Sequence, residues 1–331
     1  MIKKKEGIFL KYLFFDIECS NCFDGKRKIC EFGYVLTDEN FHVLKKDEFP
    51  ISPGQNNRNN CFDVEILKRD PTFQWAYDYD CYFNSEEFPY FYPSIKKLFE
   101  DKNTKVFGFS ASNDIRYLGY AFKRYHLQPY QYKVLDIQIL VKHYLKNNEN
   151  LGLQSVFKTL CSEHELKTLQ PHLSRDDAYM SMRVLEELLK KMNLSLADAI
   201  QQCPNCSYDA NEYLENFHQQ KLLEQRKRMG RKIWKNFIRS RQGLYKKGKI
   251  DIDKRIVISD EIKTNQEELT RILDIIKERS FLPVKSATES DIWVLLNEEE
   301  REKVLQHLHF PYQGEILILS EFIDSSEKVK Q

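Results

Sequence analysis

The sequence predicts an α/β protein in which a mixed sheet flanked by helices precedes a basic helical linker and a small α/β module. Three observations lead to this prediction. The chain has 331 residues, enough for about two domains. Its first part begins with apolar runs of strand length, which then alternate with amphipathic stretches. Between residues 221 and 255, 14 Lys and Arg stand against 3 Asp and Glu.

The first domain is expected over residues 8–192. Apolar runs predict strands at 12–15, 30–36, 43–51, 105–109 and 133–137. Apolar residues at helical spacing predict helices at 93–100, 114–125, 138–144 and 175–192. Because strands come first and only later alternate with helices, the sheet is expected to be mixed.

A linker over 193–248 is expected to carry one basic amphipathic helix that stops at Gly243. Its apolar stripe comprises Leu222, Met229, Ile233, Trp234, Phe237 and Ile238. The remaining surface holds the candidate nucleic-acid contacts, Arg226, Lys227, Arg228, Arg231, Lys232, Lys235, Arg239 and Arg241. The whole chain has a net charge of only +1, so this excess indicates an acidic partner, most often nucleic acid. A solvated linker that docks on the neighbouring domain, or a membrane-surface or calmodulin-type helix, has the same pattern.

Residues 249–331 regain strand character in three apolar runs, at 255–259, 291–296 and 315–319. Helical stretches separate these runs, which predicts a small α/β module. No run of eighteen apolar residues is present, and the basic N-terminus lacks the apolar region of a signal peptide. We therefore expect a cytoplasmic protein without a membrane partner.

Eight cysteines are too few for a disulfide framework in a chain of this length. Two CxxC pairs, Cys19/Cys22 and Cys203/Cys206, together offer four thiolates to a zinc ion. They lie far apart in sequence, so inert thiols are the default expectation.

Acidic residues follow the first predicted strand in a pattern that indicates a metal site. The two-residue period of a strand places Asp16 and Glu18 on one face, where two carboxylates repel each other unless a cation lies between them. Asp114 opens a helix after a strand, and Asp177 lies in the first turn of another, five residues after His172. Taken singly, an Asp at a helix start is usually a cap and a loop His is usually solvent-exposed.

Four carboxylates and a histidine are what two-metal phosphodiester hydrolysis requires. The segments FFDIEC, FGFSASNDIRYL and HLSRDDAYMSMRV resemble, in this order, the three motifs of the DEDDh 3′–5′ exonucleases. That family includes the replicative proofreading subunit and ribonuclease T. The resemblance covers about residues 8–192 and implies a ribonuclease H-like fold. It also implies that family members bind a single strand at its 3′ end and release nucleoside monophosphates.

The resemblance assigns roles residue by residue. It implies two Mg²⁺ or Mn²⁺ ions held by Asp16, Glu18, Asp114 and Asp177, with His172 as general base. Asp136 matches a family aspartate that does not bind metal, and Asp176 is expected to cap the helix or face solvent. Ser110, Asn113 and Cys19 depart from the usual Asn, Phe and Thr, departures that concern substrate preference.

The tail resembles a BRCT domain more weakly, through RIVISDEI, VKSATESDIWVLL and EILILSEFI. Asp260 replaces the glycine that usually follows the first strand, which puts phosphate binding by Ser259 in doubt. An unrelated docking module for a protein or DNA partner is the alternative.

Ten aromatic residues lie between 73 and 92, and they suit base stacking and core or partner packing equally well. Taken together, the sequence predicts a metal-dependent 3′–5′ exonuclease of single-stranded nucleic acid, with DNA favoured. The alternatives are an exoribonuclease of RNA turnover and a non-catalytic nucleic-acid-binding scaffold of the same fold.

Overall fold

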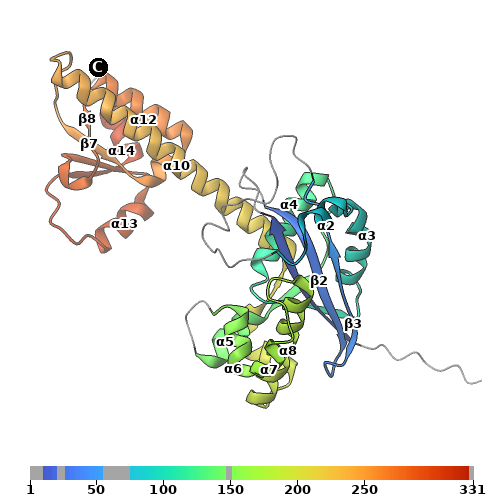
Figure 1. The fold of residues 1–331 in the computed structure, drawn as a ribbon. Coiled ribbons are helices and arrows are strands. Elements are labelled where there is room, and N and C mark those ends of the chain that lie inside the picture. The colour runs from blue at the N-terminus through green and yellow to red at the C-terminus, as the bar shows by residue number, and fades with distance from the viewer. Residues whose placement is uncertain (1–9, 21–26, 55–74, 147–150, 328–331) are drawn as a thin grey trace, which may run out of the picture. The chain divides into compact units, whose positions relative to one another are not determined.

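The computed structural model describes residues 10–20, 27–54, 75–146 and 151–327. The chain divides into two compact units, Met1–Asn216 and Phe217–Gln331, and the boundary falls inside one long helix, α10 (Ala210–Lys246) (Figure 1). The expected divisions after residues 192 and 248 do not coincide with this boundary. Residues 193–216 complete the first unit, and the second half of α10 packs within the second.

A mixed sheet forms the centre of the first unit, and its described strands lie in the order β3-β2-β1-β4-β5-β6. They are β1 (Lys11–Ser20), β2 (Lys28–Asp38), β3 (Val43–Pro50), β4 (Thr104–Gly108), β5 (Lys133–Asp136) and β6 (Ser207–Asp209). β1 is antiparallel to β2 and parallel to β4, β4 is parallel to β5, and β5 is antiparallel to β6. The expected mixed sheet flanked by helices is confirmed. The short polar strand β6 has no apolar run and was not predicted.

Helices cover both faces of this sheet (Figure 1). Leu13 and Phe15 point to a core beneath α3 (Phe88–Phe99) and α4 (Ser112–Tyr125). Tyr12 and Phe14 point to the opposite core, beneath the remaining helices of this unit. Those helices are α5 (Ile137–Leu145), α6 (Leu153–Leu160), α7 (Glu163–Leu166), α8 (Ser174–Met192) and α9 (Leu196–Gln202).

The aromatic stretch serves mainly as core. Tyr82, in α2 (Tyr79–Asn84), and Phe88 are buried, and the half-buried Trp75 and Tyr77 pack around Tyr82. Tyr90 is 68% exposed and so remains open to other contacts. Phe73 lies outside the described residues. Core packing, one of the two predicted roles, therefore accounts for most of the described rings.

Cys203 and Cys206 are buried in the core beneath α8. Cys19 packs against the core on the other face of the sheet, and Cys22 lies outside the described residues. A zinc ion shared by both pairs would therefore need ligands from opposite faces, which argues against that reading.

The second unit is built on a parallel sheet whose described strands lie in the order β10-β9-β7-β8. Three of these strands, β7 (Arg255–Ile258), β9 (Ile292–Leu295) and β10 (Glu315–Ile318), were predicted, whereas β8 (Leu282–Pro283) is too short to be visible in sequence. The helices are α11 (Asp260–Thr264), α12 (Gln266–Glu278), α13 (Glu298–Gln306) and α14 (Leu319–Glu327). No helix in the described part of the chain is long and apolar enough to cross a membrane.

Helix α10 departs from its prediction in two respects. It runs past Gly243 to Lys246, and the real stop is Gly248, whose φ of 63° lies in the left-handed region. Its apolar stripe is also divided, since Trp234 and Ile238 are buried in the second unit while Met229 is 60% exposed.

Candidate active site

The five predicted site residues come from three elements that meet at one edge of the sheet. Asp16 and Glu18 lie on β1, on the face shared with Tyr12 and Phe14. Because β1 and β4 are parallel, their carboxyl ends share an edge, and α4 begins just after β4 with Asp114 in its first turn. Helix α8 packs on β1 and β2 and carries Asp177 in its first turn, with His172 just before it.

Three of these side chains are close enough to share one ion. Ligand atoms of Glu18, His172 and Asp177 all lie within 4.8 Å of one another. His172 Nδ1 lies 3.6 Å from Glu18 Oε1. The backbone of His172 has a φ of 62°, a left-handed conformation that histidine adopts more readily than most residues. This turn directs the chain from the preceding loop into α8.

Asp16 and Asp114 belong to the same cluster, because the charges of its other carboxyls raise their pKa values. Desolvation and the negative charges of Asp114 and Asp177 raise the pKa of Asp16 well above its usual range. Desolvation and the charge of Glu18 do the same to the pKa of Asp114. Burial, followed by the charge of Glu18, raises the pKa of Asp177 to about 7, against the opposing effect of His172. The cluster thus holds mutually repelling carboxylates.

These residues fit a divalent cation. Asp177 is 9% exposed, and its buried Oδ1 has no hydrogen-bond partner among the described residues. An ionised oxygen without a donor is costly in a protein interior, and a hard cation removes that cost. Asp16, Glu18, Asp114 and Asp177 are the residues that would hold Mg²⁺ or Mn²⁺.

Two residues that were not predicted place α8 against the sheet. Gly33 faces Asp16 across the β1–β2 pair, and a Cβ there would lie 2.1 Å from the backbone nitrogen of Arg175. Only glycine therefore allows this approach. Glu31, opposite Glu18, is buried and accepts a hydrogen bond from the backbone N–H of Ser174 at 3.3 Å. The sequence signal was the EFG triplet within the second predicted strand.

The two neighbouring aspartates serve the scaffold. Asp176 is buried, so the solvent-facing alternative is wrong, and it accepts a hydrogen bond from the Gln170 N–H at 2.9 Å while pairing with Lys46 at 2.8 Å. Asp136 caps α5 through the Gln138 N–H and also accepts from the Ser110 N–H at 3.1 Å. Asp136 thereby holds the turn that leads to Asp114.

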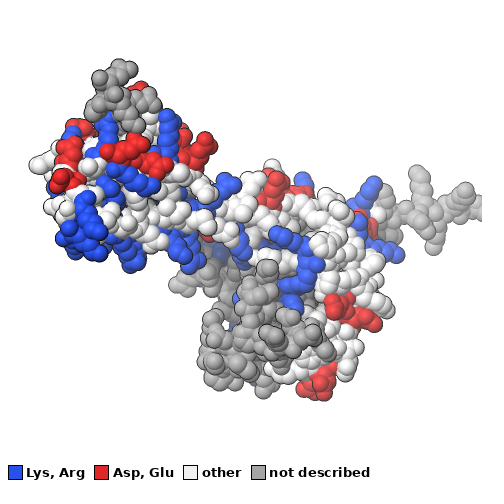
Figure 2. Space-filling view, turned by 90° about the horizontal axis from the view of Figure 1, so that it is seen from above, with Lys and Arg blue, Asp and Glu red and all other residues white. Residues whose placement is uncertain are grey.

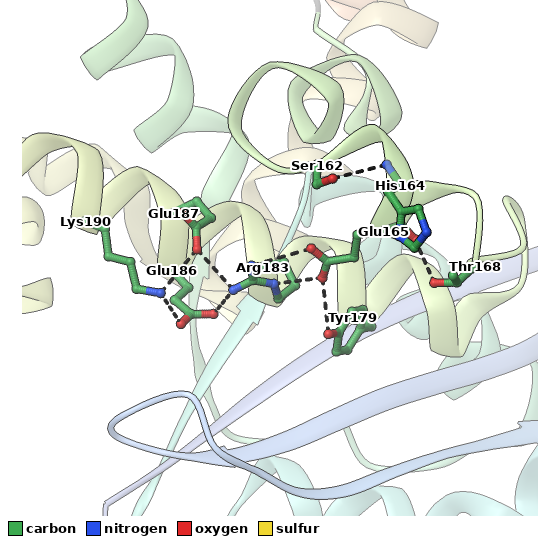
Figure 3. A network of polar contacts seen from close by, with 9 residues as sticks. All are labelled: Ser162, His164, Glu165, Thr168, Tyr179, Arg183, Glu186, Glu187 and Lys190. Atoms are coloured by element: carbon green, nitrogen blue, oxygen red, sulfur yellow. Dashed lines mark hydrogen bonds and ion pairs between the residues drawn. The ribbon is translucent and has the colours of Figure 1, made fainter.

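A polar network ties the segment before His172 to the outer side of α8 (Figure 3). Glu165, in α7, accepts from Arg183 Nε at 2.9 Å and from the Tyr179 hydroxyl at 3.3 Å. Arg183 also contacts Glu186 and Glu187 one turn further along α8. The loop that carries His172 is thus anchored at its start by α7.

The predicted basic contacts do not all face solvent. Arg241 is buried, and its guanidinium donates to the carbonyls of Ile276 and Phe281 at 3.5 and 3.4 Å, so its assignment as a nucleic-acid contact is wrong. Arg231 pairs with Asp260. Lys227 is half-buried, and the exposed members are Arg226, Arg228, Lys232, Lys235 and Arg239.

No protein-family model matches this chain, and no curated protein matches it in sequence. Solved structures are similar to it over about half its length. The nuclease domain of 3′hExo, a DEDDh family member bound to rAMP, is 14% identical and covers 55% of this chain and 93% of its own, with a TM-score of 0.45.

Two further solved structures are similar to a comparable degree. Pop2p from S. pombe, in a Mg²⁺- and Mn²⁺-bound form, is 16% identical over 54% of this chain and 83% of its own, with a TM-score of 0.43. Exonuclease I from E. coli, in complex with an oligonucleotide, is 15% identical over 56% of this chain and 41% of its own, with a TM-score of 0.43. All three structures are similar to this chain at low sequence identity.

Proposed function

We propose that this protein is a divalent-metal-dependent 3′–5′ exonuclease of single-stranded nucleic acid. The observation that carries the proposal is the convergence of four carboxylates and His172, with an unpartnered buried oxygen on Asp177. Two bound Mg²⁺ or Mn²⁺ ions would activate water and offset the charge on the leaving oxygen. The complete set of five residues favours an enzyme over a non-catalytic scaffold of the same fold.

His172 has the geometry of a general base. Its side chain is 48% exposed, whereas that of Glu18 is 21% exposed, so the imidazole lies at the rim of the cluster. An exposed imidazole can take a proton from an attacking water and pass it to solvent. The Glu18 carboxylate, whose Oε1 lies 3.6 Å from His172 Nδ1, is placed to orient the imidazole.

A stripe of four cations on α10 is proposed to bind the nucleic-acid backbone. Arg228, Lys232, Lys235 and Arg239 follow at intervals of four, three and four residues, which places them on one helix face. Trp234, Ile238 and Arg241 follow the same rhythm on the face buried in the second unit. Figure 2 shows Lys and Arg gathered on one flank of this unit. A single-sign stripe suits a polyanion.

Residues 249–331 are proposed as a BRCT-like docking module for a protein or DNA partner. Their three predicted strands follow in the expected order. A phosphate ligand at Ser259 is not part of the proposal. The Ser259 hydroxyl caps α11 by accepting from the Ile262 N–H at 3.3 Å, and the Glu300 side chain also contacts it.

The proposed activity is tested with purified protein and 5′-labelled single-stranded DNA and RNA of matched sequence. We expect a ladder that shortens from the 3′ end with Mg²⁺ or Mn²⁺, and none with EDTA or with the Asp16→Ala variant. Faster shortening of DNA supports the favoured substrate, and faster shortening of RNA supports the exoribonuclease alternative. Intact DNA and RNA with both ions would overturn the proposal in favour of a binding protein.

A further inference from the structure

One buried carboxyl connects three separate parts of the first unit. Glu31, on β2, is 1% exposed. Its Oε1 accepts a hydrogen bond from the hydroxyl of Tyr82, in α2. Its Oε2 accepts a hydrogen bond from the backbone N–H of Ser174, at the start of α8, at 3.3 Å. Neither catalysis nor metal binding as proposed above uses this side chain.

The hydrogen bond to Ser174 replaces a missing helix cap. The residue at the N-cap position of α8 is Leu173, whose side chain has no atom that accepts a hydrogen bond. The first N–H groups of a helix need acceptors from elsewhere, and Glu31 supplies one from the sheet. Ser174 lies between His172 and Asp177, so this bond holds the backbone that carries both.

The second partner of Glu31 is itself fixed in place. Tyr82 is fully buried, and its hydroxyl accepts the backbone N–H of Tyr77 at 3.3 Å while it donates to Glu31. The rings of Trp75 and Tyr77 pack edge-on against the Tyr82 ring, with centroids at 6.4 and 5.8 Å. This packing leaves the hydroxyl little freedom, so it fixes the carboxyl plane of Glu31.

Two other anchors hold the loop before His172. Before the loop, Glu165 contacts Arg183 (Figure 3). Within the loop, the Gln170 N–H donates a hydrogen bond to Asp176. Within the segment, the Asp177 carboxylate accepts the backbone N–H of His172, and Glu31 accepts the backbone N–H of Ser174 from the sheet.

We propose that Glu31 and Tyr82 are positioning residues that set the backbone of His172 and Asp177 by holding the start of α8. The kinetic test of this proposal rests on the proposed nuclease function, whereas the test by amide hydrogen exchange does not. It assigns the effect of Glu31 to hydrogen bonding and not to charge, because Glu31 lies opposite Glu18, where another negative charge only adds repulsion.

Glu31→Gln and Glu31→Ala separate these two effects. A glutamine can accept from the Ser174 N–H through its oxygen and donate to the Tyr82 hydroxyl through its amide. The hydrogen bond from the Ser174 N–H thus survives without the charge and the one with Tyr82 reverses its direction, whereas alanine removes both. We expect kcat to fall about tenfold or more in Glu31→Ala with little change in KM, and to stay within about threefold in Glu31→Gln. Equal losses in the two variants would overturn the proposal.

Tyr82→Phe tests the positioning role independently, since it keeps the ring and removes only the hydroxyl. Its matched control is Tyr130→Phe, because Tyr130 is also fully buried and donates to the Tyr92 carbonyl in the core on the other face of the sheet. We expect kcat to fall several-fold in Tyr82→Phe and not in Tyr130→Phe, after both are matched for thermal stability. Equal kcat in both variants contradicts the proposal.

Amide hydrogen exchange tests the positioning role without any activity. We expect residues 172–178 to exchange about tenfold faster in Glu31→Ala and faster in Tyr82→Phe, and at the wild-type rate in Glu31→Gln. If the wild-type protein cleaves nothing, the nuclease assignment fails while this measurement still decides the positioning role. Unchanged exchange in Glu31→Ala and Tyr82→Phe would overturn it.

Discussion

At the residue scale, Asp177 combines two demands that conflict in the metal-free protein. A metal ligand must be ionised, yet burial and the charge of Glu18 raise the pKa of Asp177 to about 7. Such a carboxyl is retained at a cost to stability, which is common where a site is built for a ligand. The cost disappears when a cation binds, so stability, pH and metal binding are linked at this position.

Asp177→Asn is expected to abolish cleavage and stabilise the metal-free protein. At about pH 8 the wild-type carboxyl is ionised and repels Glu18, whereas the amide does not, so the melting temperature of the variant rises by a few degrees. Mn²⁺ should raise the melting temperature of the wild type much more than that of Asp177→Asn. Differential scanning calorimetry with and without Mn²⁺ makes the measurement, and a lower metal-free melting temperature in the variant would contradict it.

The pKa of Asp177 also predicts how pH acts. The folded protein holds a proton that the unfolded chain has lost, so metal-free stability falls as pH rises from the usual value of 3.8 to about 7. Mn²⁺ requires the deprotonated carboxylate, so its affinity falls by at least about tenfold per pH unit below about 7, and the raised pKa values of Asp16 and Asp114 make this dependence steeper. Isothermal titration at several pH values measures this. An affinity for Mn²⁺ that does not change with pH below about 7 would contradict this prediction.

At the element scale, the site depends on how closely α8 approaches β2. Gly33 permits this contact, because a Cβ at that position would overlap the backbone of Arg175 and Ser174. A substitution must push the helix away from the strand that faces Asp16, because the obstacle is backbone and cannot rotate aside. The approach of His172 and Asp177 to Glu18 would be lost with it.

Gly33→Ala is therefore expected to reduce cleavage by about 100-fold and destabilise the protein by about 1–3 kcal/mol, the usual cost of overpacking. Gly152→Ala is the control, since a Cβ there meets no described atom within 4 Å and the residue precedes a helix on the same face. Activity assays and urea unfolding of both variants measure the effects. Equal activity in the two variants would show that α8 can shift without consequence.

Helix α10 carries a structural arginine, Arg241, two residues after Arg239, which is proposed to bind nucleic acid. Arg241→Ala removes the donor to the Phe281 carbonyl and one of two donors to the Ile276 carbonyl, so we expect a loss of about 1–3 kcal/mol and an unchanged salt dependence of binding. Arg239→Ala should leave stability unchanged and reduce the salt slope by about 1. Urea unfolding and binding titrations over a salt series distinguish them, and the opposite pairing of effects would refute the assignment.

At the scale of the whole molecule, a net charge of +1 conceals a strong separation of charge. The acids of the first unit gather where cations are proposed to bind, and the bases of α10 face solvent on the second unit. Counterion release makes binding to such a basic surface depend steeply on salt, whereas binding of a divalent ion in a buried cluster depends on pH. Nucleic-acid binding and metal binding can therefore be distinguished, the first by its dependence on salt and the second by its dependence on pH.

Neutralising the whole stripe tests the nucleic-acid surface. Changing Arg228, Lys232, Lys235 and Arg239 to Gln should reduce the slope of log affinity against log salt by about 3, while cleavage of a dinucleotide is unchanged. The control removes the same charge from exposed positions outside α10, namely Arg271, Lys277, Lys285 and Lys303. Equal slopes in the two variants would assign the effect to net charge alone, and an unchanged slope in the stripe variant would return α10 to a structural role.

Apolar periodicity was sufficient to predict most strands of the first unit, whereas the helices α2, α6, α7 and α9 were not predicted. Strands and helices around Asp16, Asp114 and Asp177 were expected close to where they occur, since apolar periodicity records which face is buried. The same periodicity failed on α10. Leu222 and Met229 repeat at helical spacing yet are exposed, because spacing shows that a face exists but not whether another element covers it.

The sequence by itself determined the proposed chemistry, because phosphodiester hydrolysis needs particular side chains and their types and order are written in the chain. Only the tertiary structure decided which residues support that chemistry. Gly33 and Glu31 lie within a strand pattern that any β-former would satisfy, and their roles come from Ser174 and Arg175, about 140 residues away in sequence. Likewise, Arg241 is indistinguishable from Arg239 until the core of the second unit surrounds it. Contacts across a sheet depend on what lies opposite, which no local pattern contains.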